Sequence, residues 1–247
     1  MSLILVTDDG PIRTVRMNRP EKKNALTPPM YEALSAALTE PREGLRCILI
    51  AGNESGFTAG NDIGAFMAAA QQGGELGGPT LSFLHVLARC ATPIVAAVGG
   101  NAVGIGTTML LHCDHVVAAS DARLSTPFVA LGLLPEAAST LLAPRLMGHA
   151  RAFELLVMGH PLSADEAKAA GLVNRVVAPQ ELEAAALAAA REIAALPPEG
   201  VRIARALMRG APDEILARID EEAKLFRERM TSPEAQAAFM AFLTRKR

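Results

Sequence analysis

The stretch that decides the fold is residues 92–121, TPIVAAVGGNAVGIGTTMLLHCDHVVAASD. It begins with the apolar run PIVAAV, passes through a glycine-rich turn and ends in a second apolar run, HVVAAS. Short runs rich in valine and isoleucine are typical of buried strands, and the segment TTMLLHC between them is predicted to be a helix. A strand, a turn, a helix and a further strand in series indicate an α/β fold.

The same stretch also raises the question of a membrane span, because no charged residue lies between Arg89 and Asp114. Pro93 and the four glycines of this stretch would break a helix that faces lipid, and its polar residues would be costly in a bilayer. A buried strand, turn and helix is therefore the better interpretation.

The segments before this stretch repeat the pattern of strands and helices. Strands are predicted over residues 3–8, 12–17 and 47–52, and the first two are joined by the turn Asp9-Gly10-Pro11. A helix is predicted to begin after Thr27, which has the residue type of an N-cap and is followed by proline.

The segments after this stretch are predicted to be mostly helical. Ser163 and Glu166 have the spacing of a capping box, and Ser232-Pro233 is typical of a helix start. The prolines at 197 and 198 interrupt the helical pattern, so we divide the chain into a core, residues 1–196, and a C-terminal helical region, residues 197–247. The glycine-rich segment QQGGELGGP, residues 71–79, is predicted to be a loop or lid.

Composition excludes several classes of function. The chain has 247 residues, with 24 Lys and Arg against 26 Asp and Glu. It therefore has no excess of positive charge that would favour a nucleic acid or an anionic membrane as partner. Three cysteines and five scattered histidines show no metal-binding spacing, so we expect free thiols and no metal site. No targeting leader is recognised at the start and no Ser-Lys-Leu address at the end, so we expect a cytoplasmic protein.

The glycine-rich turn at residues 99–106 suggests two kinds of ligand site, because a strand, a turn and a helix start direct free backbone N–H groups at a ligand. A dinucleotide fingerprint would need a third glycine where Met109 stands, and Asp121 is the one residue that supports it. The alternative is an oxyanion hole, in which N–H groups hold charge that develops on a carbonyl oxygen. The loop SGFTAGNDIGAF, residues 55–66, offers the second donor that such a hole needs.

Glu136 is the candidate for proton transfer. It stands in GLLPEAAS, residues 132–139, directly after an apolar run. A carboxylate in apolar surroundings either fills a structural role, such as a turn or a pair with Arg145, or has a raised pKa suited to proton transfer.

Five blocks follow one another along the chain: NRPEKKNAL, FTAGNDIGAF, residues 92–121, STPFVALGLLPEAAS and GHPLSADEAKAAGLVNRVV. With these blocks the chain resembles the crotonase superfamily, the enoyl-CoA hydratase/isomerase group, over nearly its whole length. The resemblance implies a spiral of ββα turns with a C-terminal helical oligomerisation region, a homotrimer or a dimer of trimers, and an acyl-CoA thioester as substrate.

The resemblance also assigns roles to single residues. The two N–H donors would be those of Asn61 and Ile105. The two glutamates with which hydratases of this family add water would fall at Thr108 and Phe128, and neither is a carboxylate. Glu136 matches the single catalytic glutamate of the Δ3,Δ2-enoyl-CoA isomerase branch, and the blocks are most similar to its peroxisomal type.

The expected function is therefore isomerisation of a 3-enoyl-CoA to the trans-2 isomer by one glutamate, without a cofactor apart from the CoA of the substrate. The alternatives are another acyl-CoA enzyme of the family, such as a hydratase, or an acyl-CoA-binding relative without catalysis. Lys22 and Lys23 would meet the CoA nucleotide, although an ordinary solvated pair would look the same. By resemblance, the other substrate-binding positions are Ala25, Leu26, Ala59, Gly60, Asp62, Ile63, Gly104, Phe128 and Leu133.

Overall fold

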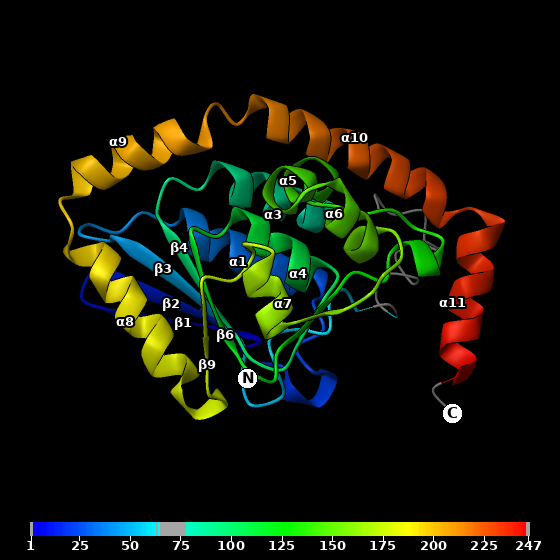
Figure 1. The fold of residues 1–247 in the computed structure, drawn as a ribbon, viewed down its shortest axis with the longest axis horizontal. Coiled ribbons are helices and arrows are strands. Elements are labelled where there is room, and N and C mark those ends of the chain that lie inside the picture. Colours follow the sequence, from blue (N-terminus) through cyan, green and yellow to red (C-terminus); the bar gives the residue numbers. More distant parts are fainter. Residues whose placement is uncertain (1, 63, 65–77, 246–247) are drawn as a thin grey trace.

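The computed structural model describes residues 2–62, 64 and 78–245, and its strands form two sheets (Figure 1). The larger sheet has the order β1-β2-β3-β4-β6-β9, and the smaller has the order β5-β7-β8. In the larger sheet β1 and β2 are antiparallel, and each following pair is parallel. The strands are β1 (Ile4–Asp9), β2 (Ile12–Met17), β3 (Cys47–Ala51), β4 (Ile94–Val98), β5 (Asn101–Val103), β6 (His115–Ala119), β7 (Arg123–Ser125), β8 (Leu162–Ser163) and β9 (Arg175–Val177).

Helices cover both faces of the larger sheet and form the whole C-terminal region (Figure 1). The α-helices are α1 (Pro28–Thr39), α3 (Gly78–Arg89), α4 (Ile105–Thr108), α5 (Ser139–Met147), α6 (His149–Leu156), α7 (Ala164–Ala169), α8 (Leu182–Ala195), α9 (Pro198–Arg209), α10 (Asp213–Met230) and α11 (Pro233–Arg245). Four short 3-10 helices are η1 (Pro20–Lys22), η2 (Met109–His112), η3 (Val129–Leu131) and η4 (Pro179–Glu181).

The central strands β3 and β4 are buried along their whole length, because side chains that alternate along a strand pack against helices on both faces. Ile48 and Ile50 of β3 belong to the main core with α1 and α3. Leu49, between them, belongs to a second core against α8. An α/β fold is therefore confirmed, and the continuous apolar runs of the sequence are explained by burial on both faces.

The predicted helix over residues 107–113 is only partly present. The α-helix α4 begins at Ile105 and ends at Thr108, and the 3-10 helix η2 continues to His112. The start of α4 is set by Gly104, whose φ of 57° is unfavourable for residues with a side chain. The predicted strands around it are confirmed as β4 and β6, whereas residues 71–77 of the predicted loop lie outside the described part.

The C-terminal helices begin where the prolines predicted an interruption: α8 ends at Ala195 and α9 begins at Pro198. In Figure 1, α9 and α10 arch over one side of the molecule and α11 descends beyond them. Within the described ranges, no helix combines the length and apolar character needed to cross a bilayer. The division of the chain at residues 196 and 197 stays a prediction.

Candidate functional site

Two loops that the sequence singled out lie side by side because their backbones pair. The Thr58 N–H donates to the Asn101 carbonyl at 3.0 Å, and the Val103 N–H donates to the Thr58 carbonyl at 3.0 Å. The segment that leads to Asn61 is thereby fixed along β5, which leads directly into Ile105. The pairing brings both predicted donors to one place.

Glycines allow this close approach. A Cβ atom on Gly60, whose φ is +83°, would lie 2.8 Å from the Val103 carbonyl oxygen. A Cβ atom on Gly106 would lie 2.5 Å from Cγ2 of Thr58. Real Cβ atoms are not found at such distances, so a side chain at either position would push the two loops apart.

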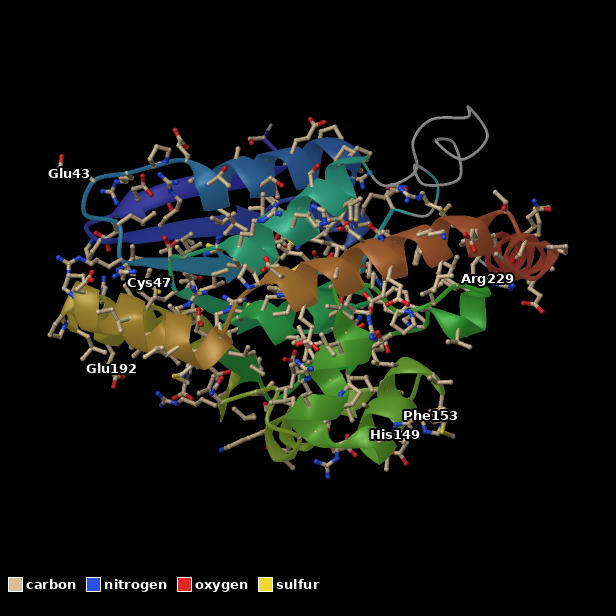
Figure 2. The ribbon with its side chains drawn as sticks, turned by 90° about the horizontal axis from the view of Figure 1, so that it is seen from above. Glu43, Cys47, His149, Phe153, Glu192 and Arg229 are labelled. Carbon is tan, nitrogen blue, oxygen red and sulfur yellow. The ribbon has the colours of Figure 1, made fainter. Side chains whose placement is uncertain are left out.

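Asn61 and Ile105 line one cavity of about 450 Å³. The predicted residues Ala59, Gly60, Gly104, Phe128 and Leu133 also line it, together with Val103, Pro127, Ala130, Leu131, Phe226, Ala238, Phe239 and Ala241. Figure 2 shows Arg229 of α10, the helix that contributes Phe226 to this cavity, at the opposite end of the molecule from Cys47. The cavity is mostly apolar, which is typical of a pocket that excludes water from a small polar centre.

The backbone geometry leaves the two predicted N–H groups without acceptors among the described residues. Ile105 is the first residue of α4, where an N–H group has no partner inside the helix. At the other loop, the Gly60 carbonyl and the Asp62 N–H both face Leu26, with hydrogen bonds of 2.8 Å each. Since backbone groups alternate in an extended segment, the Asn61 N–H points to the opposite side.

Side chains fix the Asn61 loop from behind. The Tyr31 hydroxyl is hydrogen-bonded to Oδ1 of Asn61. Nη1 of Arg19 donates to the Asp62 carboxylate at 2.7 Å and to the Ala25 carbonyl at 2.9 Å. Asp62, predicted to contact the substrate, is therefore engaged by a cation of its own chain.

Several other predicted positions lie apart from the cavity. Lys22 and Lys23 are exposed and do not line it. Leu26 packs in the main core, so only its backbone reaches the loop. Ile63 lies outside the described residues.

Glu136 is buried, 7% exposed, and its Oε1 has no hydrogen-bond partner among the described residues. It does not pair with Arg145, which binds Glu214 instead. Burial raises the pKa of Glu136 from 4.5 to about 8, and the charge of Glu222 adds to this shift. An unpaired buried carboxyl with this pKa is suited to proton transfer near neutral pH.

Glu136 does not line the cavity described above, and its charge interacts with two residues that were not predicted from the sequence. Tyr31 of α1 is hydrogen-bonded to Asn61. Burial raises the pKa of the Tyr31 phenol, and the charge of Glu136 raises it further. Glu222 of α10 is the second buried carboxylate beside Glu136. No local signal identifies either, because both lie on amphipathic helices where a tyrosine or glutamate is ordinary.

The buried histidine at position 112 is a structural contact. Its Nε2 donates to the Ala137 carbonyl at 2.8 Å, and burial lowers its pKa to about 4. Among the described side chains, no cluster of three or more His, Cys, Asp or Glu could hold a metal ion.

The raised pKa of Glu136 predicts how stability depends on pH. Between pH 4.5 and about 8 the folded state binds the proton of Glu136 more tightly than the unfolded state does, so this contribution to stability is lost as pH rises. Glu136→Gln removes the titration, and we expect its melting temperature to exceed that of the wild type more at pH 9 than at pH 5. Thermal unfolding at both pH values measures this, and a difference independent of pH would contradict the raised pKa.

Comparison with known proteins decides the family. The sequence profile described as Enoyl-CoA hydratase/isomerase matches residues 8–247. The chain belongs to this family. Crotonase relatives in this family include Enoyl-CoA delta isomerase 2 of Rattus norvegicus, to which the chain is 37% identical over 98% of its length, spanning 64% of that relative. The Short-chain-enoyl-CoA hydratase of Clostridium acetobutylicum is 31% identical, with 99% of this chain and 95% of that protein covered.

The crotonase fold is also shown by solved structures. The enoyl-CoA hydratase/isomerase from Pseudoalteromonas atlantica superimposes with a TM-score of 0.93 at 39% identity, covering 99% of this chain and 98% of that chain. The predicted fold class and family are thus confirmed. Because the crotonase relatives carry both isomerase and hydratase names, the reaction must be argued from the site.

Proposed function

We propose that the chain is a Δ3,Δ2-enoyl-CoA isomerase that uses one carboxyl group. Glu136 removes a proton from C2 of a 3-enoyl-CoA, and the electrons move to the thioester oxygen as an enolate. The N–H groups of Asn61 and Ile105 hold that oxygen. The same carboxyl then returns the proton to C4, so the double bond moves to C2–C3 and no atom is gained or lost.

The observation that carries this proposal is the buried Glu136, whose Oε1 has no partner among the described residues and whose pKa is raised to about 8. A carboxyl that served only the structure would be satisfied by hydrogen bonds or by a cation. A base with a pKa near the working pH accepts and returns a proton with little loss of driving force.

The residues at the two positions where hydratases of the family would have glutamates support isomerisation rather than hydration. Thr108 is buried, and its hydroxyl is 3.4 Å from the Gly104 carbonyl of its own helix. Phe128 is an apolar lining residue of the cavity. Neither can activate a water molecule as a carboxylate does, so addition of water lacks its general acid and base.

The substrate proposal rests on the shape and character of the cavity. Apolar residues of α10 and α11, among them Phe226 and Phe239, line it together with Asn61 and Ile105. This arrangement suits an acyl chain with its thioester carbonyl at Asn61 and Ile105 and keeps water from the enolate. The CoA of the substrate is the one carrier group that the mechanism needs.

The test of this function is a pair of assays on the purified wild-type protein. One follows conversion of 3-enoyl-CoA to trans-2-enoyl-CoA, and the other follows addition of water to trans-2-enoyl-CoA. We expect fast isomerisation and negligible hydration. Hydration at a rate equal to or above isomerisation would contradict the proposal, and acyl-CoA binding with neither reaction would point to a binding relative.

We also propose self-association through α9, in line with the expected trimer or dimer of trimers. Leu207 and Met208 are 79% and 87% exposed, and Ile203 on the same helix is also exposed. Burying such a face between subunits would remove apolar surface from water. Light scattering should give a mass of at least three 25.9 kDa chains, reduced in the double variant Leu207→Ser, Met208→Ser; an unchanged mass would contradict this use of α9.

A further inference from the structure

The segment that follows Glu136 has a strained backbone. Ala137 and Ala138 have φ values of 66° and 53°, in the left-handed region that alanine rarely adopts. A residue with a side chain is less stable in this conformation than in a right-handed one. Both alanines are fully buried, so the surrounding structure must impose this conformation.

Two side chains from distant elements hold this segment. On one side, His112 of η2 donates to the Ala137 carbonyl at 2.8 Å. On the other side, the Glu222 carboxylate of α10 accepts the Ala138 N–H at 2.7 Å, the Thr140 N–H at 3.1 Å and the Thr140 hydroxyl at 2.6 Å. Hydrogen bonds to a charged acceptor are the strong ones, so Glu222 is the main anchor of the bend.

Glu222 is held by these donors and forms no ion pair within the described residues. It is 3% exposed, whereas its neighbour Glu221 pairs with Arg218 at the surface. Arg218 approaches the cluster through Nη1, 3.1 Å from the Thr140 hydroxyl oxygen. Three hydrogen bonds stabilise this buried carboxylate in place of a cation.

We propose that Glu222 is a positioning residue for Glu136: it fixes the strained segment that carries Glu136 and places a second negative charge beside it. The inference rests on the proposed isomerase function, and it names a residue outside the cavity that sets the behaviour of the base. The titratable and charged groups around the two glutamates are Tyr31 of α1, His112 of η2, and Arg218 of α10.

The two tasks of Glu222 can be separated by substitution. Burial raises the pKa of Glu222 to about 7, although Thr140, Ala138 and Arg218 lower it, and the charge of Glu222 raises the pKa of Glu136. Glu222→Gln removes the charge and, because its amide NH2 replaces one of the two accepting oxygens, also loses the hydrogen bond from Ala138 or those from Thr140; it should lower the titration midpoint of Glu136 by about one pH unit. Glu222→Asp keeps the charge but shortens the side chain, so it should leave that midpoint near the wild-type value while kcat falls about tenfold.

The experiment uses protein labelled with 13C at the glutamate carboxyl groups and follows the resonance of Glu136 as a function of pH. The resonance is assigned to Glu136 because it is absent from Glu136→Gln. The matched control is Glu228→Gln, the same change at an exposed position of the same helix, which should titrate and turn over like the wild type. The pH dependence of kcat/KM for a 3-enoyl-CoA is measured on the same samples, where the midpoint in Glu222→Gln should shift in parallel.

An unchanged Glu136 midpoint in Glu222→Gln would overturn the inference about charge, and an unchanged kcat in Glu222→Asp would overturn the inference about position. If neither variant folds, the wild-type titration decides: the Glu136 resonance should show a second, smaller step as Glu222 ionises. A single step would overturn the coupling. The resonance can be followed in an inactive protein, so a failure of the proposed function and a failure of this inference give different results.

Discussion

Replacing Glu136 with glutamine is expected to reduce isomerisation of 3-enoyl-CoA by about 10²- to 10⁴-fold, the contribution that a positioned general acid and base makes. Glutamine has nearly the same size and shape as a protonated glutamate, so acyl-CoA binding should stay nearly unchanged. Initial rates give kcat, and calorimetry with a saturated acyl-CoA gives binding.

The control for this variant is Glu154→Gln, which changes an exposed glutamate of α6. It should keep wild-type kcat and binding. A Glu136→Gln protein that retained a tenth or more of the wild-type kcat would show that the proton is carried by another group.

The second large effect is expected from Gly60→Ala. The new Cβ would lie 2.8 Å from the Val103 carbonyl oxygen, on a backbone with φ of +83°, so the loop must move and the Asn61 N–H moves with it. Loss of one oxyanion donor reduces kcat by about 10²- to 10³-fold. We expect a reduction of that size in kcat, measured on a folded protein at saturating substrate.

Gly44→Ala is the matched control, because Gly44 has a similar φ of +76° and nothing within 4 Å of the added Cβ. It should lower the free energy of unfolding by about 1–2 kcal/mol through backbone strain alone and leave kcat unchanged. The oxyanion assignment would be wrong if both variants lost stability equally and Gly60→Ala kept its kcat.

The parts of the fold with a local signal could be predicted from the sequence. The apolar runs at β3, β4 and β6 are continuous because both faces of these strands are covered, and such burial is visible residue by residue. The α-helix predicted over 107–113 extends too far, because α4 ends at Thr108 and the chain continues as the 3-10 helix η2. Where a helix changes to a 3-10 turn depends on tertiary packing, which the sequence pattern does not carry.

In the candidate site, too, some residues have a sequence signal and others do not. The loops of Asn61 and Ile105 have glycine signals, and the family resemblance identifies Glu136. Glu222 has no such signal: it reaches the segment after Glu136 across more than eighty positions of sequence. Long-range contacts of this kind come from packing of the C-terminal helices, not from any local pattern.

The most direct test of a single proton carrier is isomerisation in D₂O with 3-enoyl-CoA that carries protium at C2. C4 carries one hydrogen in the substrate and two in the product, so one hydrogen is delivered there in each turnover. If Glu136 takes the C2 proton and returns it to C4 in a site that excludes water, a substantial share of the product from a single turnover should have two protium atoms at C4. NMR or mass spectrometry of the product gives this share. One deuterium at C4 in every product molecule of the first turnover would contradict the account, because the delivered proton would then come from solvent.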